Sequence, residues 1–307
     1  MKLKYSLLNI SLCLFSLLSF CQNFEGIKRI NGADLYIKAI GKGSPIIIIH
    51  GGPGLNYTYF LPQLTDLSKK HRLIFFDQRA SGKSSADFDS SQISLNMMVD
   101  DIDAIRRNFG NKKISVLGHS WGGLLAMKYA IKYPQYLKTL ILVSTVSPKA
   151  KEFETETNAV IKSRLTPGDS ILRSEILKSE SFKQGKGSAY QAILKLSFKP
   201  SFYEKRFLDS LNLKIDDNYS TKRKTLLMLS KDLNNYDFYE SISTIKKPVL
   251  IIHGDFDAIP LALPQKIQTS IPTSRLVVIQ NAGHFPFIEK QKEFSHIVLD
   301  FLKHYNK

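Results

Sequence analysis

The sequence predicts an α/β fold class in which helices cover both faces of a mainly parallel central sheet. Apolar runs rich in β-branched residues recur along the 307-residue chain, and intervals long enough to hold a helix separate most of them. This alternation stops after Val143 and resumes near residue 246. Alternating strands and helices favour parallel strands, because each crossover between parallel strands needs a long connection. The interruption predicts a helical insertion within one continuous fold.

The expected strands of the first half differ in how deeply they are buried. Residues 34–40, "DLYIKAI", alternate like a half-exposed strand, whereas residues 45–50, "PIIIIH", are apolar throughout, as a central strand is. The next expected strands are "RLIFFD" (72–77), "KISVLG" (113–118) and "LKTLILVS" (137–144), each with an interval before it that could hold a helix. Residues 94–110 have apolar side chains at helical spacing and end on Gly110, a typical helix stop.

The second half divides into an insertion and a return to the core. Residues 148–245 contain no buried-strand run and are rich in Lys, Glu and Ser, which predicts a helical cap. Strand signals return in "KPVLIIHGD" (247–255) and "SRLVVIQNAGH" (274–284), and an amphipathic helix is expected at about 289–305. The predicted division is therefore a core of residues 22–147 and 246–307, with a cap of residues 148–245.

Residues 1–21, "MKLKYSLLNISLCLFSLLSFC", have the layout of an export signal: two lysines, an apolar stretch and small residues before the expected cleavage site. The apolar stretch is shorter than the roughly 20 residues of a membrane span. We therefore expect a periplasmic or secreted protein with no stable membrane span in its mature form. Lipid anchoring at Cys21 is the alternative, which the bulky Phe20 disfavours. Both cysteines, Cys13 and Cys21, lie in this segment, so the mature chain would have no thiol chemistry.

The chain carries a formal net charge of +16 from scattered lysines. Without Lys2 and Lys4, the mature chain keeps 41 of the 43 basic residues and all 27 acidic ones. The basic runs are short and have no interleaved aromatic residues, so we expect a solvated surface and no nucleic-acid partner. No H-E-x-x-H motif or paired carboxylate cluster occurs, and Asp77 stands where a phosphate-binding loop needs glycine. We expect neither a metal nor a nucleotide site.

The strongest local motif is "VLGHSWGG", which contains G-x-S-x-G at residues 118–122. Here a strand turns sharply into a helix, and the turn exposes the hydroxyl of Ser120 while Gly118 and Gly122 prevent collisions. The backbone N–H of Trp121 then lies at a helix N-terminus, where it can stabilise a developing oxyanion. The motif alone is weak, but its position between a strand and a helix makes it a specific signal of a serine nucleophile.

A serine nucleophile needs a histidine base and an acid that orients the histidine. Asp257 follows one expected strand in "IIHGDFDAIP", and His284 follows the next in "VVIQNAGHFPF". Asp255 is the rival acid, but Asp257 lies further beyond the strand end. Ser120, Asp257 and His284 are therefore the candidate catalytic residues. His50 and His253 each end a strand before a glycine, where histidines mostly supply structural hydrogen bonds. His119 is an improbable base, because neighbouring side chains on such a turn point apart.

The sequence resembles the α/β-hydrolase superfamily and, within it, the proline iminopeptidase family of serine aminopeptidases. The blocks "HGGPG" (50–54), "DQRASGKS" (77–84) and "GHSWGG" (118–123) carry the narrower resemblance. The resemblance implies an α/β-hydrolase fold with an inserted helical cap and no cofactor. It implies that Ser120 is the nucleophile, His284 the base and then the acid, and Asp257 the residue that fixes the imidazole tautomer. The backbone N–H groups of Gly52 and Trp121 would form the oxyanion hole.

Two departures from this family pattern concern the loops around the site. The family usually has glycine where this chain has Leu55 and Ala80, so we expect Leu55 to narrow the mouth of the site and Ala80 to strain a tight loop. Tyr57, in an expected apolar wall of the pocket, is a candidate substrate-binding residue. Relatives that cleave N-terminal proline hold the substrate ammonium with cap carboxylates. The acidic cap candidates are Glu152, Glu154, Glu156, Glu175, Glu180, Glu204 and Glu240, with Glu204 included among the substrate-binding candidates.

These residues predict an exported serine aminopeptidase that releases N-terminal residues, proline preferentially, from small peptides through an acyl-enzyme. A cap over the active end would favour short chain ends over internal bonds. A carboxylesterase or amidase with the same triad is the nearer alternative. A non-catalytic ligand-binding protein on the same fold is the more distant one.

Overall fold

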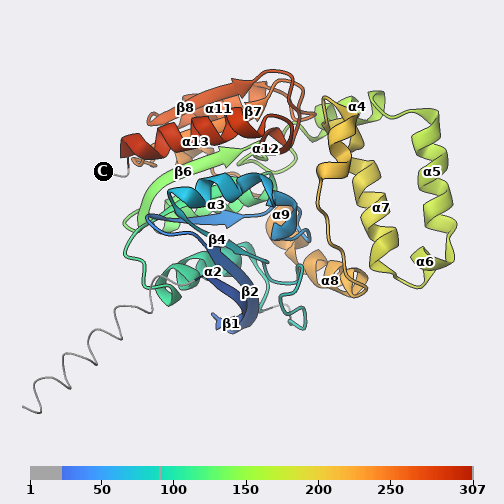
Figure 1. Cartoon of the computed structure of the whole chain (residues 1–307), viewed down its shortest axis with the longest axis horizontal. Coiled ribbons are helices and arrows are strands. Elements are labelled where there is room, and N and C mark those ends of the chain that lie inside the picture. The colour runs from blue at the N-terminus through green and yellow to red at the C-terminus, as the bar shows by residue number, and fades with distance from the viewer. Residues whose placement is uncertain (1–22, 90, 306–307) are drawn as a thin grey trace, which may run out of the picture.

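An eight-stranded sheet forms the centre of the computed structural model, which describes residues 23–89 and 91–305 (Figure 1). The strand order is β1-β2-β4-β3-β5-β6-β7-β8. The strands are β1 (Phe24–Ile30), β2 (Ala33–Ile40), β3 (Pro45–Ile49), β4 (Arg72–Phe76), β5 (Ile114–His119), β6 (Leu137–Val143), β7 (Val249–Gly254) and β8 (Ser274–Ile279). The expected export signal, residues 1–21, lies outside the described residues.

The six strands β3 to β8 are mutually parallel, and β2 runs antiparallel to both of its neighbours, β1 and β4. The predicted mainly parallel sheet is therefore confirmed. Strand β1 was not predicted from the sequence, because its side chains alternate between exposed and half-buried at the sheet edge. A signal for it does exist: Asn31 and Gly32 both have positive φ, 47° and 78°, as the two-residue turn of a β-hairpin requires.

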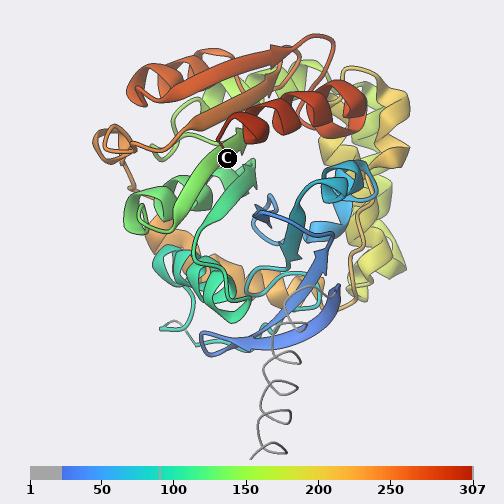
Figure 2. The same cartoon turned by 60° about the vertical axis from the view of Figure 1, so that its left-hand side comes forward.

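Helices cover both faces of this sheet, as the sequence predicts. The side chains of β3 show the two layers: Ile47 and Ile49 pack in one core cluster, and Ile46 and Ile48 in the other. The first cluster includes side chains of α2 (Leu95–Asn108), α3 (Trp121–Lys132) and α11 (Ala262–Ser270), and the second those of η3 (Gln63–Lys69) and α13 (Gln291–Tyr305). Figure 2 shows the twist that carries the strands from the orange β8 at the top to the blue β1 at the bottom.

Two connections differ from the expected helices. The segment between β3 and β4 contains only the 3₁₀-helices η2 (Tyr57–Phe60) and η3, because Pro53 and Pro62 lack the N–H donors that an α-helix through this stretch would need. The C-terminal helix expected at about 289–305 is α13, and a short helix that was not predicted, α12 (Pro286–Glu289), precedes it; Lys290 between them is not helical, with a φ of −131° and a ψ of 49°. No helix of residues 23–89 and 91–305 is long and apolar enough to cross a membrane.

The segment between β6 and β7 consists of short helices. They are α4 (Glu154–Ser163), α5 (Pro167–Lys178), α6 (Glu180–Lys183), α7 (Gly187–Phe198), η4 (Lys199–Ser201), η5 (Lys205–Ser210), α8 (Tyr219–Leu226), η6 (Leu227–Leu229), α9 (Ser230–Leu233) and α10 (Tyr239–Ile242). Helices α4 to α7 stand beside the sheet (Figure 1). Leu226, Leu229 and Ile242, in contrast, join the core cluster on the α3 face. The inserted segment therefore packs on the core through α8 to α10 and through Leu194 and Phe198 of α7, whereas α5 and α6 lie farther out.

Candidate active site

Ser120 occupies a sharp turn between β5 and α3. Its φ of 55° and ψ of −122° lie outside the regions that L-residues ordinarily adopt. The surrounding glycines make the turn possible: a Cβ on Gly118 would lie 2.3 Å from the Gly122 carbonyl oxygen, and one on Gly122 would lie 2.2 Å from the Ile49 carbonyl oxygen. The strands and the helix therefore pack so tightly around the turn that only glycine fits at positions 118 and 122, two residues before and after the serine.

Asp257 and His284 form a hydrogen-bonded pair at the same end of the sheet. The His284 Nδ1–H donates to Asp257 Oδ2 at 2.9 Å and to Oδ1 at 3.1 Å. Both side chains are buried, and the Ile259 N–H also donates to Asp257. Burial by itself would raise the pKa of Asp257, but the charge and hydrogen bond of His284 outweigh it and hold that pKa well below its usual range. The carboxylate therefore stays ionised and fixes the imidazole orientation.

The geometry separates the two candidate acids. The Asp255 carboxylate is exposed and accepts a hydrogen bond from the Ala282 N–H, so it supports the backbone of the loop that carries His284. Asp257 alone of the two contacts the imidazole. Because its Nδ1 is engaged with Asp257, His284 has Nε2 left to take a proton from a hydroxyl.

His119, the residue before Ser120, joins the turn between β5 and α3 to the backbone of His284. The rings of His119 and His284 lie 4.8 Å apart between centroids, and His119 Nε2–H donates to the His284 carbonyl oxygen at 2.8 Å. Ser120, Asp257 and His284 follow β5, β7 and β8, whose carboxyl ends share one edge of the sheet. Ligand and catalytic sites of open parallel sheets lie at this edge.

The two candidate oxyanion donors flank the serine. Trp121 is the first residue of α3, where a helix leaves its N–H groups without partners in the helix. The Gly52 N–H donates to no other group among the described residues, whereas the preceding Gly51 N–H is held by the Tyr59 hydroxyl at 2.5 Å. A Cβ on Gly51 would lie 3.3 Å from the Cβ of Ser120, so this loop passes directly beside the serine.

Gln78 connects the three sequence blocks around the site. Its Nε2 donates to the His50 carbonyl oxygen at 2.7 Å, and its Oε1 accepts from the Trp121 indole N–H at 2.9 Å. The Gln78 backbone N–H also donates to His50 Nε2 at 3.0 Å. His50 and His253 both make buried hydrogen bonds within the core, as their sequence positions predict. The role of Gln78 was not predicted, although its place in the "DQRASGKS" block was the available signal.

A cavity of about 240 Å³ lies on the side of α4, next to the loops that carry Ser120 and Asp257, although no triad side chain lines it. The N–H of Val146, one of its lining residues, donates to the Ser120 carbonyl oxygen at 3.4 Å, and Ile259 contacts Asp257 as described. The lining residues are Val146, Ser147, Lys149, Lys151, Glu152, Phe153, Glu154, Thr157, Asn158, Tyr236, Ile259 and Leu263. The cavity is thus bounded by apolar side chains with a few charged groups at its α4 side.

The acidic cap candidates lie in different surroundings. Glu152 bonds Lys266 at 2.5 Å and Tyr239 at 2.6 Å, and Glu204 pairs with Arg206 at 2.7 Å. Glu180 is paired with Lys183. Glu156, Glu175 and Glu240 are exposed. Glu154 is also exposed, but it lines the cavity, and its carboxylate has no ion-pair or hydrogen-bond partner among the described residues.

Tyr57 and Leu55 do not border this cavity. Tyr57 lines a different, more polar cavity of about 380 Å³, together with Glu25, Asp77 and Lys83. Leu55 is only 3% exposed and packs into the core, so it does not form the rim of the site as the sequence suggested. Ala80 is fully buried with a φ of 53°, which matches the strained loop expected from the missing glycine.

The inserted segment contacts both loops that carry the acid and the base. The Ser201 carbonyl oxygen accepts from the His284 N–H at 2.8 Å. The buried Glu289 carboxylate accepts from the N–H groups of Gly283 and Glu204, at 2.7 and 3.0 Å, and so joins the base loop to the segment. Sequence patterns could not reveal these links, because each joins residues that only the folded chain brings together.

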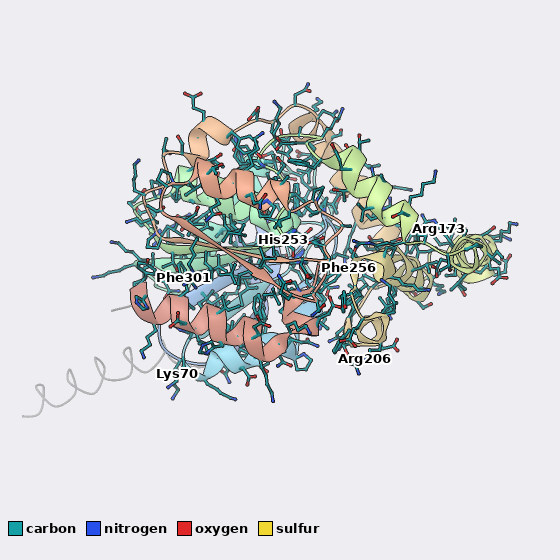
Figure 3. All side chains as sticks on the ribbon, turned by 90° about the horizontal axis from the view of Figure 1, so that it is seen from above. Lys70, Arg173, Arg206, His253, Phe256 and Phe301 are labelled. Carbon is teal, nitrogen blue, oxygen red and sulfur yellow. The ribbon has the colours of Figure 1, made fainter. Side chains whose placement is uncertain are left out.

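The acid loop has its own contact with the inserted segment. Arg164 donates to the Phe256 carbonyl oxygen at 2.7 Å, and its guanidinium carbon lies 3.6 Å from the centre of the Phe256 ring. Figure 3 shows Phe256 where the core meets the inserted helices, with Arg173 farther out. Within the described residues, no group of three or more His, Cys, Asp or Glu side chains is arranged to hold a metal ion.

Comparisons with known proteins agree with this architecture. The alpha/beta hydrolase fold family model matches residues 44–291. The chain is 29% identical to a proline iminopeptidase of Saccharolobus solfataricus, over 91% of this chain and 92% of that protein. It superimposes on the proline iminopeptidase of Mycobacterium smegmatis with a TM-score of 0.69 at 18% identity, covering 92% and 98% of the two chains. An esterase from Exiguobacterium antarcticum gives 0.66 at 21% identity, covering 91% and 100%.

Proposed function

Because the chain belongs to the alpha/beta hydrolase family, we propose that it is a serine hydrolase, namely an aminopeptidase that releases N-terminal residues, proline preferentially, from small peptides. One observation carries the catalytic part: Ser120 occupies a strained turn, and the residue before it, His119, bonds the backbone of His284 in a buried His284–Asp257 pair. The similarity to proline iminopeptidases over about nine-tenths of the chain supports the substrate class. The proposed reaction needs no cofactor.

The proposed mechanism follows from the atoms around Ser120. His284 Nε2 removes the hydroxyl proton as the serine oxygen attacks the substrate carbonyl. The N–H groups of Gly52 and Trp121 stabilise the resulting oxyanion, each by on the order of 3 kcal/mol. Protonated His284 then gives its proton to the departing amine, which leaves an acyl-enzyme. Water attacks this ester by the same steps and restores the serine, while Asp257 stabilises the imidazolium each time it forms.

The cavity beside the triad supports a small substrate with a free amino group. Its volume of about 240 Å³ suits one residue, and Val146, Phe153 and Ile259 supply apolar walls for a pyrrolidine ring. We propose that Glu154 binds the substrate ammonium, because it is the lining carboxylate that no described cation neutralises. Lys151 also lines the cavity and opposes this charge, so the amine dependence has to be measured directly.

The test is a panel of chromogenic amides of proline and other residues, each with a free and an acetylated N-terminus. We expect cleavage of prolyl naphthylamide, its loss on acetylation, and no cleavage by Ser120→Ala. Glu154→Gln should raise KM for the free amine about tenfold or more, as expected for a lost charge-assisted contact. Exposed Glu175→Gln is the matched control. Equal cleavage of free and acetylated substrates would contradict the aminopeptidase proposal.

A carboxylesterase or amidase is the second candidate function. The apolar walls of the cavity and the structural likeness to an esterase favour it. Turnover of a short acyl ester with no turnover of any aminoacyl amide would support this alternative. Hydrolysis that survives Ser120→Ala would instead show that the nucleophile is wrongly assigned, and an absence of any hydrolysis by the wild type would favour a non-catalytic binding protein.

A further inference from the structure

We propose that His119 and Tyr59 are positioning residues. Together they form a buried hydrogen-bonded link that fixes the loop of His284 (the base loop) relative to the loop of Gly51 and Gly52 (the oxyanion loop), on the two sides of Ser120. The proposal rests on the proposed serine chemistry but not on the aminopeptidase specificity. His119 does not exchange a proton with substrate in this role. It sets the distance between the two loops that do the chemistry.

The link consists of three hydrogen bonds in series. The Gly51 N–H donates to the Tyr59 hydroxyl oxygen at 2.5 Å, and that hydroxyl lies 2.9 Å from His119 Nδ1. His119 Nε2 lies 2.8 Å from the His284 carbonyl oxygen. One end is therefore the residue before the oxyanion donor Gly52, and the other end is the base itself.

The donors in this series can be assigned from chemistry alone. A carbonyl oxygen only accepts, so the His119 proton must be on Nε2. In the neutral ring Nδ1 is then an acceptor, and the Tyr59 hydroxyl must donate to it. The Tyr59 oxygen is left to accept from the Gly51 N–H. Tyr59 and His119 thus each donate one hydrogen bond and accept one, and for a neutral His119 ring no other arrangement of protons satisfies all three bonds.

The surroundings keep the link neutral and rigid. His119 is 1% exposed and Tyr59 is fully buried, and the rings of Phe60, Phe285 and Phe287 contact both of them. Burial, followed by the nearby charge of His284, lowers the pKa of His119 to about 3. The ring therefore stays neutral wherever a histidine base could work. A second proton, on Nδ1, would require the Tyr59 hydroxyl to turn away and its oxygen to accept from His119 instead.

Removal of the link should affect the chemical step more than substrate binding. Neither His119 nor Tyr59 lines the cavity beside the triad. Small misplacements of catalytic groups are costly, since a shift of about 1 Å can lower rates about 100-fold. We therefore expect a lower kcat with KM changed less than about twofold, which a residue that bound substrate would not give.

Three variants divide the link into its parts. Tyr59→Phe removes the hydroxyl and breaks both of its bonds. His119→Asn keeps an acceptor near the Nδ1 position but cannot reach the His284 carbonyl, whereas His119→Gln places an amide N–H near the Nε2 position. The control is Tyr129→Phe, because Tyr129 is also fully buried, and its hydroxyl bonds Asp103 on helix α2.

The experiment measures the rate at which a fluorophosphonate modifies Ser120, together with kcat and KM for whichever substrate the wild type turns over. We expect Tyr59→Phe and His119→Asn to slow modification and kcat about 10- to 100-fold, with KM nearly unchanged. His119→Gln should recover part of the loss, and the Tyr59→Phe/His119→Asn double variant should be no worse than the slower single variant. Thermal unfolding of each variant identifies any loss due to misfolding.

The outcomes separate this proposal from the proposed function. Unchanged rates in folded Tyr59→Phe, or an equal loss in Tyr129→Phe, would overturn the positioning role and leave the serine mechanism intact. Slow modification in the link variants of an enzyme that cleaves esters but not aminoacyl amides would support the positioning role and refute the aminopeptidase. A wild type that does not react with the fluorophosphonate would refute both.

Discussion

At the scale of single residues, the candidate site depends on which polar atoms are already engaged. Ser120 is held in a strained conformation, Asp257 is bonded to His284, and Gly51 is bonded to Tyr59. Within the part of the chain that the structure describes, three groups have no hydrogen-bond partner and could meet a substrate: the serine hydroxyl, His284 Nε2 and the Gly52 N–H. The polar groups that already have hydrogen-bond partners therefore decide which groups remain for catalysis.

The two neighbouring aspartates offer a sharp residue-scale prediction. Asp257→Asn should lower kcat by about 10⁴-fold, because the amide no longer stabilises the imidazolium and can favour the wrong imidazole tautomer. Asp255→Asn is the matched control, since the Asp255 carboxylate accepts from the Ala282 N–H in the loop of His284 and does not contact the imidazole. Steady-state rates of both variants on the same substrate provide the comparison. Equal losses in the two variants would contradict the assignment of the acid.

Sequence patterns predict part of this site and miss the rest for a definite reason. The turn around Ser120 has a local signature, because the glycines needed for close packing are its sequence neighbours. Asp257 and His284 follow strands and are found by their order. Tyr59, Gln78 and Glu289 act through contacts with residues 60, 43 and 6 positions away, which no spacing rule encodes. Leu55 was misjudged because a side chain beside a catalytic loop can turn toward the core.

At the scale of elements, strands were predicted well and connections less well. Continuous apolar runs identified the buried strands β3 to β7, since burial on both faces leaves a clear pattern. The edge strand β1 has no such pattern, and the 3₁₀-helices η2 and η3 depend on proline positions within a long connection. The inserted helices are mostly exposed, so their pattern carries little information about where they dock.

The contact between η4 and the base loop makes an element-scale prediction. A Cβ on Gly283 would lie 1.9 Å from the Ser201 carbonyl oxygen. Because that oxygen belongs to the backbone, the clash can be relieved only by a movement of the main chain. Gly283→Ala should therefore push η4 away from the base loop, lower kcat/KM at least tenfold and destabilise the fold by about 1–3 kcal/mol. Enzyme kinetics and urea unfolding measure the two effects.

Gly168→Ala, in α5, is the matched control for this substitution. Its nearest neighbour, the Thr166 Oγ1, would lie 3.7 Å from the new Cβ, an ordinary contact distance. We expect wild-type activity and stability from this variant. A Gly283→Ala protein with wild-type kinetics would show that the base loop does not need its close contact with Ser201.

At the scale of the whole molecule, buried histidines link stability to pH. Burial lowers the pKa of His50 to about 4, against about 6.5 in an unfolded chain. Between pH 6.5 and about 4, His50 therefore binds a proton in the unfolded chain but not in the folded chain. The contribution of His50 to the unfolding free energy is fully present above pH 6.5 and is lost as the pH falls to about 4, by roughly 3 kcal/mol.

A difference measurement isolates this contribution. Burial raises the pKa of Asp77 to about 6. Between pH 6 and 4 the folded chain therefore binds a proton at Asp77 that the unfolded chain does not, which raises the unfolding free energy as the pH falls and partly offsets the loss from His50. We expect the stability difference between wild type and His50→Gln to shrink or change sign as urea unfolding is repeated from pH 7.5 down to pH 4.5. Exposed His296→Gln is the control. A pH-independent difference for His50→Gln would contradict the prediction.

The attachment of the inserted helices to the triad loops has a consequence for how substrates enter. Ser201 is bonded to the His284 backbone and Arg164 to the Phe256 backbone, so helix displacement would pull on the base and acid loops together. If these helices moved outward to admit a substrate, the loops of His284 and Asp257 would move with them, and the triad would lose its catalytic geometry while the site is open. The proposed hydrolysis would then take place only while the inserted helices lie in the position that the structure shows.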